Sequence, residues 1–459
     1  MSQTDRRSSE VEISTKCRDI GDVAGQSSLC RGKYIRLQFP WWINPLWASS
    51  FFVLMLIGAG MFVDNDTFER WRVPKYVDGN LTVLAAVPAV FFLVGIAIPM
   101  IRYLPRKELT VWLGPRTIDT CSKAATVTFW LAVAGSALWL IFAIRQGAGF
   151  AQFKAVLDFE ANSVGNLKRI SGPVAGLTTL TQFGPIAVCL RMLLVRSGLR
   201  DNRYQLYVLV ALGLARAFFY GERLAIIELA LPIIVVLVTV SRFESSRRAL
   251  SGAILPVFAV PALWAVFAVF EYSRSWLYYR SVSDVPFVTY ISERLLGYYV
   301  TSINNGSLYY LNASGYPHDP IYSFAALWDS PIIGDILGRA TIGTMEVRSW
   351  WAWLLETDAN PEFNNTSTFL VTSADFGTVW ASVYWLALGL AIGLIYTSLK
   401  KGRVFGILAY SVCFIGILEC VRITYWMQGR FTPVAIGLVI LYFLFDSSRK
   451  RDEQGGAPT

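Results

Sequence analysis

The stretch ALGLARAFFYGERLAIIELALP, residues 211–232, carries two apolar segments into one tight turn. These apolar segments extend over about residues 203–220 and 222–241. Each is close in length to the roughly 20 residues that a membrane-spanning helix needs. Arg216 and Arg223 flank the turn between them. A guanidinium at a hydrocarbon boundary is costly, and such residues are typical of functional sites. The stretch therefore predicts a helical hairpin in a membrane, with two arginines placed close to its turn.

The whole chain has the composition of a membrane protein. Of its 459 residues 54% are apolar and only 16% are charged, and the mean hydropathy is +0.46. Soluble domains carry about 25% charged residues. The net charge of +9 fits basic loops on one side of a membrane, so it gives no reason to expect a nucleic acid as partner.

Hydropathy predicts an all-α polytopic protein with about ten transmembrane helices. We place them near 44–63, 80–101, 122–144, 173–195, 203–220, 222–241, 249–271, 376–398, 404–422 and 431–446. Lysine and arginine are concentrated in both tails and in alternate connections, which predicts that the N- and C-termini are cytoplasmic. The first forty or so residues lack an early apolar core, so we expect an uncleaved anchor rather than a signal peptide.

These spans divide the chain into five regions. We expect a largely disordered cytoplasmic tail (1–43), spans one to seven (44–271), a large outer loop (272–372), spans eight to ten (373–446) and a short cytoplasmic tail (447–459). The outer loop is the longest connection, and connections of that length usually serve a function.

The arginines predicted at the outer face are the first candidates for a binding site. Arg216, Arg223, Arg274 and Arg422 lie near the outer ends of predicted spans, and Arg430 follows the last of these turns. The planar guanidinium fork suits phosphate and carboxylate oxygens. The alternatives are headgroup contact by extended side chains and pairing with acids such as Glu222, Glu228 and, for Arg422, Glu419. Arg191, at the inner end of its span, is expected to extend toward the interface.

Three side chains are candidates for acid–base chemistry. Glu271 stands three residues before Arg274, so it is either a salt-bridge partner or an acid beside an anion site. His318, in GYPHDPIYSF, is the only histidine, and Asp375 begins the eighth span in SADFGTVW. Their alternatives are an exposed loop histidine and a helix cap. The six cysteines show no zinc-ligand spacing with a histidine, so no metal and no cofactor are expected.

The outer loop is rich in aromatic residues, which suits sugar rings but also suits a membrane interface. The predicted glycan contacts are Trp276, Tyr298, Tyr299, Trp350 and Trp351. Asp64 and Asp66 follow the first span, where some glycosyltransferases that use monophosphate donors place an acid; a solvated loop is the alternative.

The segment PEFNNTSTFLVTSADFGTVW, residues 361–380, resembles part of the bacterial O-antigen repeat-unit polymerases, the Wzy-type family. Asn364, Asn365 and Thr366 match an Asn-Thr element of that family, and residues 375–377 match an Asp-Phe-Gly element. Trp380 stands where a small residue is common. The turn at 221–223 and the large loop after EYSRSW are also similar to that family.

The resemblance implies a GT-C-like membrane glycosyltransferase fold in a bacterial inner membrane, with no nucleotide sugar and no obligatory metal. It implies an undecaprenyl-pyrophosphate-linked oligosaccharide as donor, transferred to a lipid-linked repeat unit at the periplasmic face, and a chain-length regulator as a further partner. By position, Arg216, Arg223 and Arg274 would bind the pyrophosphate. The alternatives are an O-antigen-type ligase, a lipid-linked oligosaccharide transporter or flippase, and a monophosphate-dependent transferase that uses Asp64 or Asp66.

Overall fold

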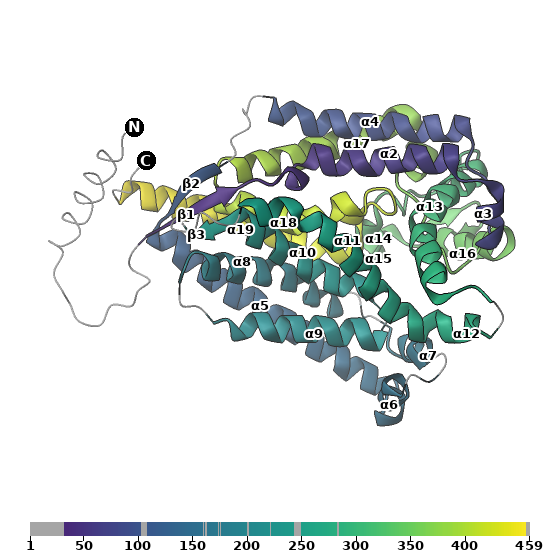
Figure 1. Ribbon diagram of the computed structural model, residues 1–459, viewed down its shortest axis with the longest axis horizontal. Coiled ribbons are helices and arrows are strands. Elements are labelled where there is room, and N and C mark those ends of the chain that lie inside the picture. The colour runs from purple at the N-terminus through teal and green to yellow at the C-terminus, as the bar shows by residue number, and fades with distance from the viewer. Residues whose placement is uncertain are drawn as a thin grey trace.

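The chain forms a bundle of long helices with a small sheet at one end (Figure 1). This computed structural model describes residues 32–101, 108–158, 160, 163–172, 174, 176–199, 202–220, 222–242, 249–281 and 284–455. Among them, seven helical segments are long and apolar enough to cross a membrane: Pro45–Phe62, Gly79–Met100, Pro115–Arg145, Thr178–Arg196, Gly252–Glu271, Phe369–Lys400 and Gly429–Gln454. Three shorter apolar helices are Tyr204–Tyr220, Leu224–Thr239 and Val404–Leu418.

Each of the ten predicted spans overlaps one of these segments, and the architecture is that of a helical polytopic membrane protein. The number of helices that cross the membrane stays a prediction. The helices of the bundle are α2 (Pro45–Phe62), α4 (Gly79–Met100), α5 (Pro115–Arg145), α8 (Gly184–Arg196), α9 (Tyr204–Tyr220), α10 (Arg223–Thr239), α11 (Ala249–Glu271), α17 (Phe369–Lys400), α18 (Val404–Leu418) and α19 (Thr432–Gln454).

Apolar side chains cover the outside of the bundle as well as its core. On α11, Val257, Phe258 and Val260 are each about two-thirds exposed, at 67%, 69% and 69%. Rows of exposed apolar residues are unfavourable in water and are normal against lipid. The bundle surface therefore agrees with the membrane composition of the sequence.

Helices α4 and α17 pack closely because small residues line their contact. A Cβ on Gly95 would lie 2.3 Å from the carbonyl oxygen of Leu386, and one on Gly389 would lie 2.2 Å from that of Phe92. Lipid tails are as apolar as the side chains of membrane helices, so the hydrophobic effect does not drive these helices together. They rely instead on such close packing. This contact fixes the position of α17 against α4.

A three-stranded antiparallel sheet closes one end of the bundle. It is formed by β1 (Lys33–Gln38), β2 (Glu108–Leu113) and β3 (Val240–Arg242), in the order β2-β1-β3. Ile35 and Leu37 are fully buried, so β1 buries alternate side chains. None of these strands is predicted from the sequence, and the predicted tail of residues 1–43 therefore ends in ordered structure.

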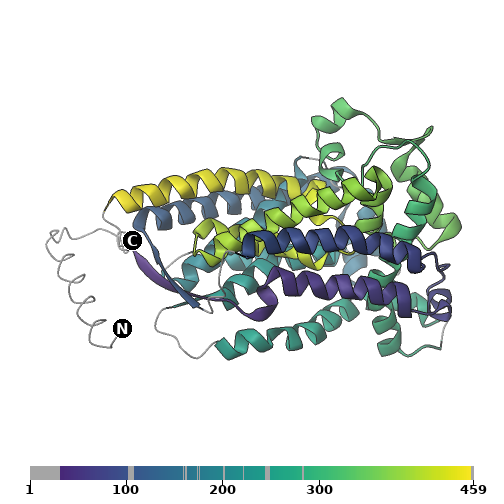
Figure 2. The ribbon, with the colours of Figure 1, turned by 90° about the horizontal axis from the view of Figure 1, so that it is seen from above.

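The two ends of the bundle carry different connections (Figures 1 and 2). The sheet end holds β1–β3 and the end of α19, and it gathers connections that the lysine and arginine bias assigns to the cytoplasm. There, Arg196 donates from Nε to the carbonyl oxygen of Val240 at 2.8 Å. We call the opposite end the loop end. It holds α3 (Asn65–Arg70), α6 (Phe150–Leu157), α7 (Ser163–Ile170) and most of residues 272–372.

Arg191 on α8 does not extend to the interface, so that expectation is wrong. Its side chain is fully buried; Nε donates to Oε1 of Gln205 at 2.7 Å, and NH2 donates to Oγ1 of Thr126 at 2.5 Å. Polar residues on the neighbouring helices α5 and α9 provide acceptors inside the bundle, which removes the reason for the side chain to leave it.

The predicted outer loop is mostly helical. Helix α11 continues through the π-helical turn η4 (Tyr272–Trp276) into α12 (Leu277–Tyr279). The 27-residue helix α13 then packs against α2, α11 and α17. The elements after it are α14 (Ala325–Trp328), α15 (Ile333–Leu337), the hairpin β4 (Thr341–Ile342) with β5 (Met345–Glu346), and α16 (Val347–Asp358); α13 itself spans Phe287–Ala313. In Figure 2 the green elements of this segment stand together at the loop end.

Candidate functional site

Two of the arginines meet at the loop end, beside the turn between α9 and α10. Arg216 binds Oε2 of Glu222 at 2.6 Å and donates to Oγ1 of Thr181 at 2.8 Å. Arg430, from the short helix η6 (Gly429–Phe431), lies 3.9 Å from the same Glu222 oxygen. The carboxylate of Glu222 therefore joins two guanidinium groups that are 214 residues apart in the sequence. We call Arg216, Arg430 and the acids that bind them the arginine cluster.

Glu228 forms the buried base of the cluster. It is 4% exposed and accepts hydrogen bonds from Tyr425 at 2.7 Å and from Gln182 at 3.1 Å. Nε of Arg430 lies 2.9 Å from its Oε1. The predicted pairing of Glu228 with an arginine is confirmed, and the partner is Arg430. A buried carboxylate needs such partners, because an unpaired charge in a bundle is strongly unfavourable.

Cations outnumber acids around Glu222. Burial raises the pKa of Glu222, but Arg216, Arg430 and Lys168 of α7 outweigh that effect and lower the pKa below its usual value. Ion pairs within 4 Å join two guanidinium groups, Arg216 and Arg430, to two carboxylates, Glu222 and Glu228, and the exposed Lys168 adds a more distant positive charge near Glu222. A cavity of about 40 Å³ beside it is lined by Arg216 and Glu228 and by mostly apolar residues, and Arg430 and Lys168 do not line it. The surplus of positive charge suits an anion.

The outer segment packs over one side of the cluster. Helix α14 contacts η6. Gly429 allows this contact, since a Cβ there would lie 2.3 Å from Cβ of Asp329. Arg430 is only 26% exposed, so an anion held there would be partly withdrawn from water.

Arg422 lies in the connection between α18 and α19, in a neutral pair. Its NH1 contacts both carboxylate oxygens of Glu419, at 2.8 and 3.1 Å. Its guanidinium carbon also lies 5.3 Å from the ring centre of Tyr299 and 5.9 Å from that of Tyr298. The predicted pairing of Arg422 with Glu419 is confirmed, and the rings hold the guanidinium in place.

The side chains of Arg223 and Arg274 lie outside the described residues. The backbone of Arg223 begins α10, and that of Arg274 lies in the π-helical turn η4. Their predicted role in binding pyrophosphate stays a prediction.

Glu271 pairs with an arginine that the sequence did not single out. It is fully buried, and its Oε2 accepts from Nε of Arg294 at 2.6 Å and from Oγ of Ser275 at 2.5 Å. Arg294 also donates to Glu362 at 2.7 Å. The ion pair joins α11 to α13, and the arrangement is structural, since both groups are occupied.

His318 and Asp375, considered as alternatives from the sequence, lie together. Nε2 of His318 is 2.9 Å from Oδ1 of Asp375, and its Nδ1 is 2.8 Å from the carbonyl oxygen of Tyr316. Asp375 also accepts from Tyr309 at 3.2 Å and from Ser323 at 2.5 Å. Asp375 does not cap α17, because the helix begins at Phe369 and the carboxylate lies inside it, just before the kink at Gly377.

Both ring nitrogens of His318 face acceptors, an arrangement that favours the doubly protonated imidazolium. The hydrogen bond to Asp375 raises the pKa of His318, while partial burial opposes the shift. An imidazolium cannot accept a proton. The pair fixes residues 316–323 to α17, and the ring has no nitrogen free for a substrate in this state.

The predicted glycan contacts divide into two groups. Trp350 and Trp351 are 9% and 4% exposed and pack around the ring of Tyr309, so they form part of a core. Trp276 packs against Phe287 and Tyr290. Tyr298 lies between Arg294 and Arg422, and Tyr299 stacks on Phe52. Glycan binding by these five residues stays a prediction.

The remaining acids and the family-like segment have local roles. Asp64 caps α3 by accepting from the backbone of Thr67 at 2.8 Å. Residues 364–367 lead without regular structure into α17, and Asn305 of α13 donates to the carbonyl oxygen of Asn365 at 3.0 Å. Among the described residues no group of three histidine, cysteine, aspartate or glutamate side chains is placed to hold a metal ion.

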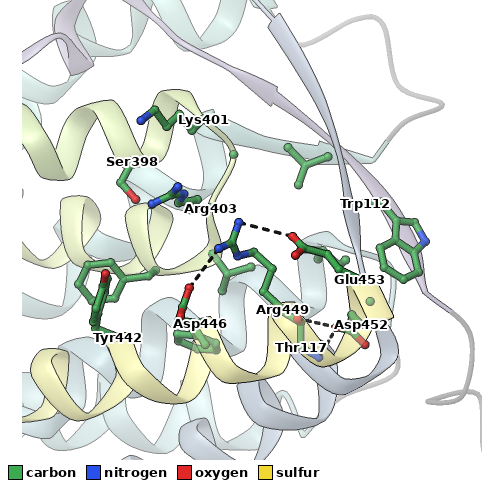
Figure 3. A pocket seen from close by; sticks show the side chains of 17 residues that line it. Trp112, Thr117, Ser398, Lys401, Arg403, Tyr442, Asp446, Arg449, Asp452 and Glu453 are labelled. Atoms are coloured by element: carbon green, nitrogen blue, oxygen red, sulfur yellow. Dashed lines mark hydrogen bonds and ion pairs between the residues drawn. The ribbon is translucent and has the colours of Figure 1, made fainter. Parts of the chain in front are cut away.

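A larger cavity, of about 550 Å³, lies at the sheet end between β2, the turn after α17 and the end of α19 (Figure 3). Arg449 is held there between Asp446 at 3.1 Å and Glu453 at 3.5 Å. Asp452 accepts from Oγ1 of Thr117 at 2.7 Å and so ties α19 to the start of α5. Asp446 and Glu453 neutralise Arg449, and Asp452 ties two helices together; Lys401 and Arg403 also line the cavity. The cavity lies at the opposite end of the bundle from the arginine cluster.

No family model matches the chain, and neither a search of curated proteins nor a search of solved structures returns a match. The geometry and the sequence therefore carry the functional argument.

Proposed function

We propose that the chain is a polymerase of exported polysaccharide in a bacterial inner membrane. It would transfer a glycan from an undecaprenyl-pyrophosphate donor to a lipid-linked repeat unit at the periplasmic face, which we assign to the loop end. The observation that carries the proposal is the arginine cluster, where Arg216 and Arg430 pair with Glu222 and Glu228 and the nearby Lys168 adds a further positive charge.

The chemistry asks little else of the protein. The bond between the anomeric carbon and the pyrophosphate oxygen breaks, and the acceptor hydroxyl forms the new glycosidic bond and loses its proton. Positive groups fixed near the departing oxygen stabilise the charge that develops there. Arg216 is held by Glu222 and Thr181, and Arg430 by Glu228, so both guanidinium groups are positioned before the donor arrives.

The candidates for accepting the hydroxyl proton are each engaged. Glu271 is paired with Arg294, and Asp375 accepts three hydrogen bonds, one of them from His318. These contacts support structural roles for the three residues. The cluster therefore supports leaving-group stabilisation and leaves the base unassigned.

The test is elongation by the purified chain in liposomes that contain only the lipid-linked repeat unit of the producing bacterium. We expect a ladder of longer glycans, and we expect Arg216→Gln to slow it about 100-fold, as for loss of one preorganised donor. Arg145→Gln is the control, since Arg145 is exposed at the end of α5 and has no hydrogen bond or ion pair with a described residue. An unaltered ladder in Arg216→Gln would contradict the assignment.

The same experiment separates the polymerase from a ligase. A ligase would leave the donor unextended until a different acceptor lipid is added. A flippase would move the donor across the liposome membrane and lengthen nothing, so either result would replace the proposed function.

A further inference from the structure

A second cavity at the loop end has features that the arginine cluster does not explain. It has a volume of about 70 Å³ and lies between the end of α3, α12, the start of α13 and residues 360–363. Trp71, Arg72, Tyr279, Tyr290, Arg294 and Glu362 are among its lining residues.

Arg72 occupies a backbone position that favours glycine. Its φ is 57°, in the left-handed region. Its backbone N–H donates to the carbonyl oxygen of Glu69 at 2.8 Å, and that of Val73 donates to Phe68 at 3.0 Å. This pair of bonds defines the Schellman ending of a helix, where glycine is the usual residue. An arginine in this conformation is strained, and residues held in such strain cluster at ligand sites.

The guanidinium of Arg72 lines the same cavity as Glu293 and Glu362 but pairs with neither. It makes no hydrogen bond or ion pair with a described residue, and its carbon lies 5.8 Å from the ring centre of Tyr279. The other two arginines of the cavity are matched, Arg70 by Glu293 at 3.5 Å and Arg294 by Glu271 and Glu362. Arg72 is therefore the cation that remains for a ligand.

One buried donor in the same wall also lacks an acceptor among the described residues. It is the indole N–H of Trp71, a residue only 6% exposed. Buried polar groups are nearly always hydrogen-bonded, so this N–H beside the cavity indicates a bound acceptor.

We propose that this cavity binds the carboxylate of an acidic saccharide. Arg72 pairs with the carboxylate, Trp71 donates to one of its oxygens, and the sugar ring lies against Tyr279. A cavity of about 70 Å³ has room for a carboxylate group. The inference rests on the proposed function, since it names an acidic sugar as part of the glycan handled at the loop end.

The test measures binding of D-glucuronate and of its neutral isostere D-glucuronamide to the full chain in nanodiscs, by saturation-transfer NMR. We expect the wild type to bind glucuronate about tenfold more tightly or better, as for one charge-assisted pair. We expect Arg72→Gly and Arg72→Asn to lose this preference. Their melting temperatures should equal or exceed that of the wild type, because glycine and asparagine tolerate a positive φ.

Several results would overturn the proposal. Equal binding of the two ligands by the wild type would do so, and so would a preference that survives in Arg72→Gly and Arg72→Asn. A lower melting temperature in both variants would make Arg72 a structural residue. Tighter binding of sn-glycerol 3-phosphate than of glucuronate would assign the cavity to a lipid headgroup instead of a saccharide.

The failure of this inference is distinct from the failure of the proposed function. A chain that elongates its donor but shows no preference for glucuronate loses only the acidic-sugar site. If the chain prefers glucuronate but does not elongate the donor, the polymerase assignment is wrong and the saccharide site is still supported.

Discussion

Two arginine sites at the loop end differ in their balance of charge. At Arg294 one guanidinium lies between two carboxylates, Glu271 and Glu362. In the arginine cluster, Arg216 and Arg430 pair with Glu222 and Glu228, and Lys168 adds a further positive charge near Glu222. A guanidinium held between two carboxylates is internally satisfied and holds helices together. Additional positive charge favours an anion, so charge balance distinguishes Arg294 from the arginine cluster.

We expect the largest effect when the ion pair between Arg294 and Glu271 is removed. Arg294→Met removes the arginine that pairs with the buried carboxylate of Glu271, which should cost about 3–5 kcal/mol in the free energy of unfolding. Unfolding by SDS titration measures the loss. Adding Glu271→Gln should restore much of the stability, because the uncompensated charge is then gone. If the two substitutions instead add their costs, the ion pair is not the reason for the loss.

The second effect concerns His318, whose contact with Asp375 is a third charged site. His318→Gln should lower stability by about 1–3 kcal/mol at pH 6, the range for a charged hydrogen bond. The hydrogen bond that His318 donates to Asp375 raises the pKa of His318 above its ordinary 6.5. The contribution is therefore complete below 6.5 and is lost as the pH rises through the raised pKa.

Melting temperatures of wild type and His318→Gln between pH 6 and 9 check this prediction. The difference between them should shrink with rising pH. A difference that grows with pH would mean that the neutral imidazole is the stabilising form. Asp319, which also favours the imidazolium, is the neighbouring acid to vary as a control.

The smallest effect sharpens the comparison within the arginine cluster. Glu222 is 28% exposed and competes with any anion for Arg216 and Arg430. Glu222→Gln should therefore increase the affinity for inorganic pyrophosphate by about two- to fivefold, the modest range of partly exposed ion pairs. Isothermal titration calorimetry measures it. Weaker binding would show that Glu222 orients the arginines more than it competes.

The sequence predicted the features that depend on local pattern. Apolar length located the helices, and the three-residue spacing of Glu419 and Arg422 predicted their pair, which the structure confirms. A buried acid needs a partner, and on that ground the sequence correctly predicted that Glu228 pairs with an arginine. It did not predict which arginine.

The sequence could not predict contacts between residues far apart in the chain. Arg294 lies 23 positions after Glu271, in a segment expected to be an outer loop, and no spacing rule connects them. His318 and Asp375 are 57 positions apart, and no spacing rule connects them either. The strands β1 and β2 pair across more than 70 positions, and each is too short to stand out from a basic tail or connection.

The most direct test of the central claim compares affinities for undecaprenyl pyrophosphate in nanodiscs. Arg216→Gln removes one cation from the cluster and leaves Glu222 partly solvated, so the fold should be preserved. We predict binding at least about tenfold weaker than that of the wild type, with Arg145→Gln unchanged. Equal affinity in all three proteins would contradict the claim that the surplus of cations at the loop end holds a diphosphate.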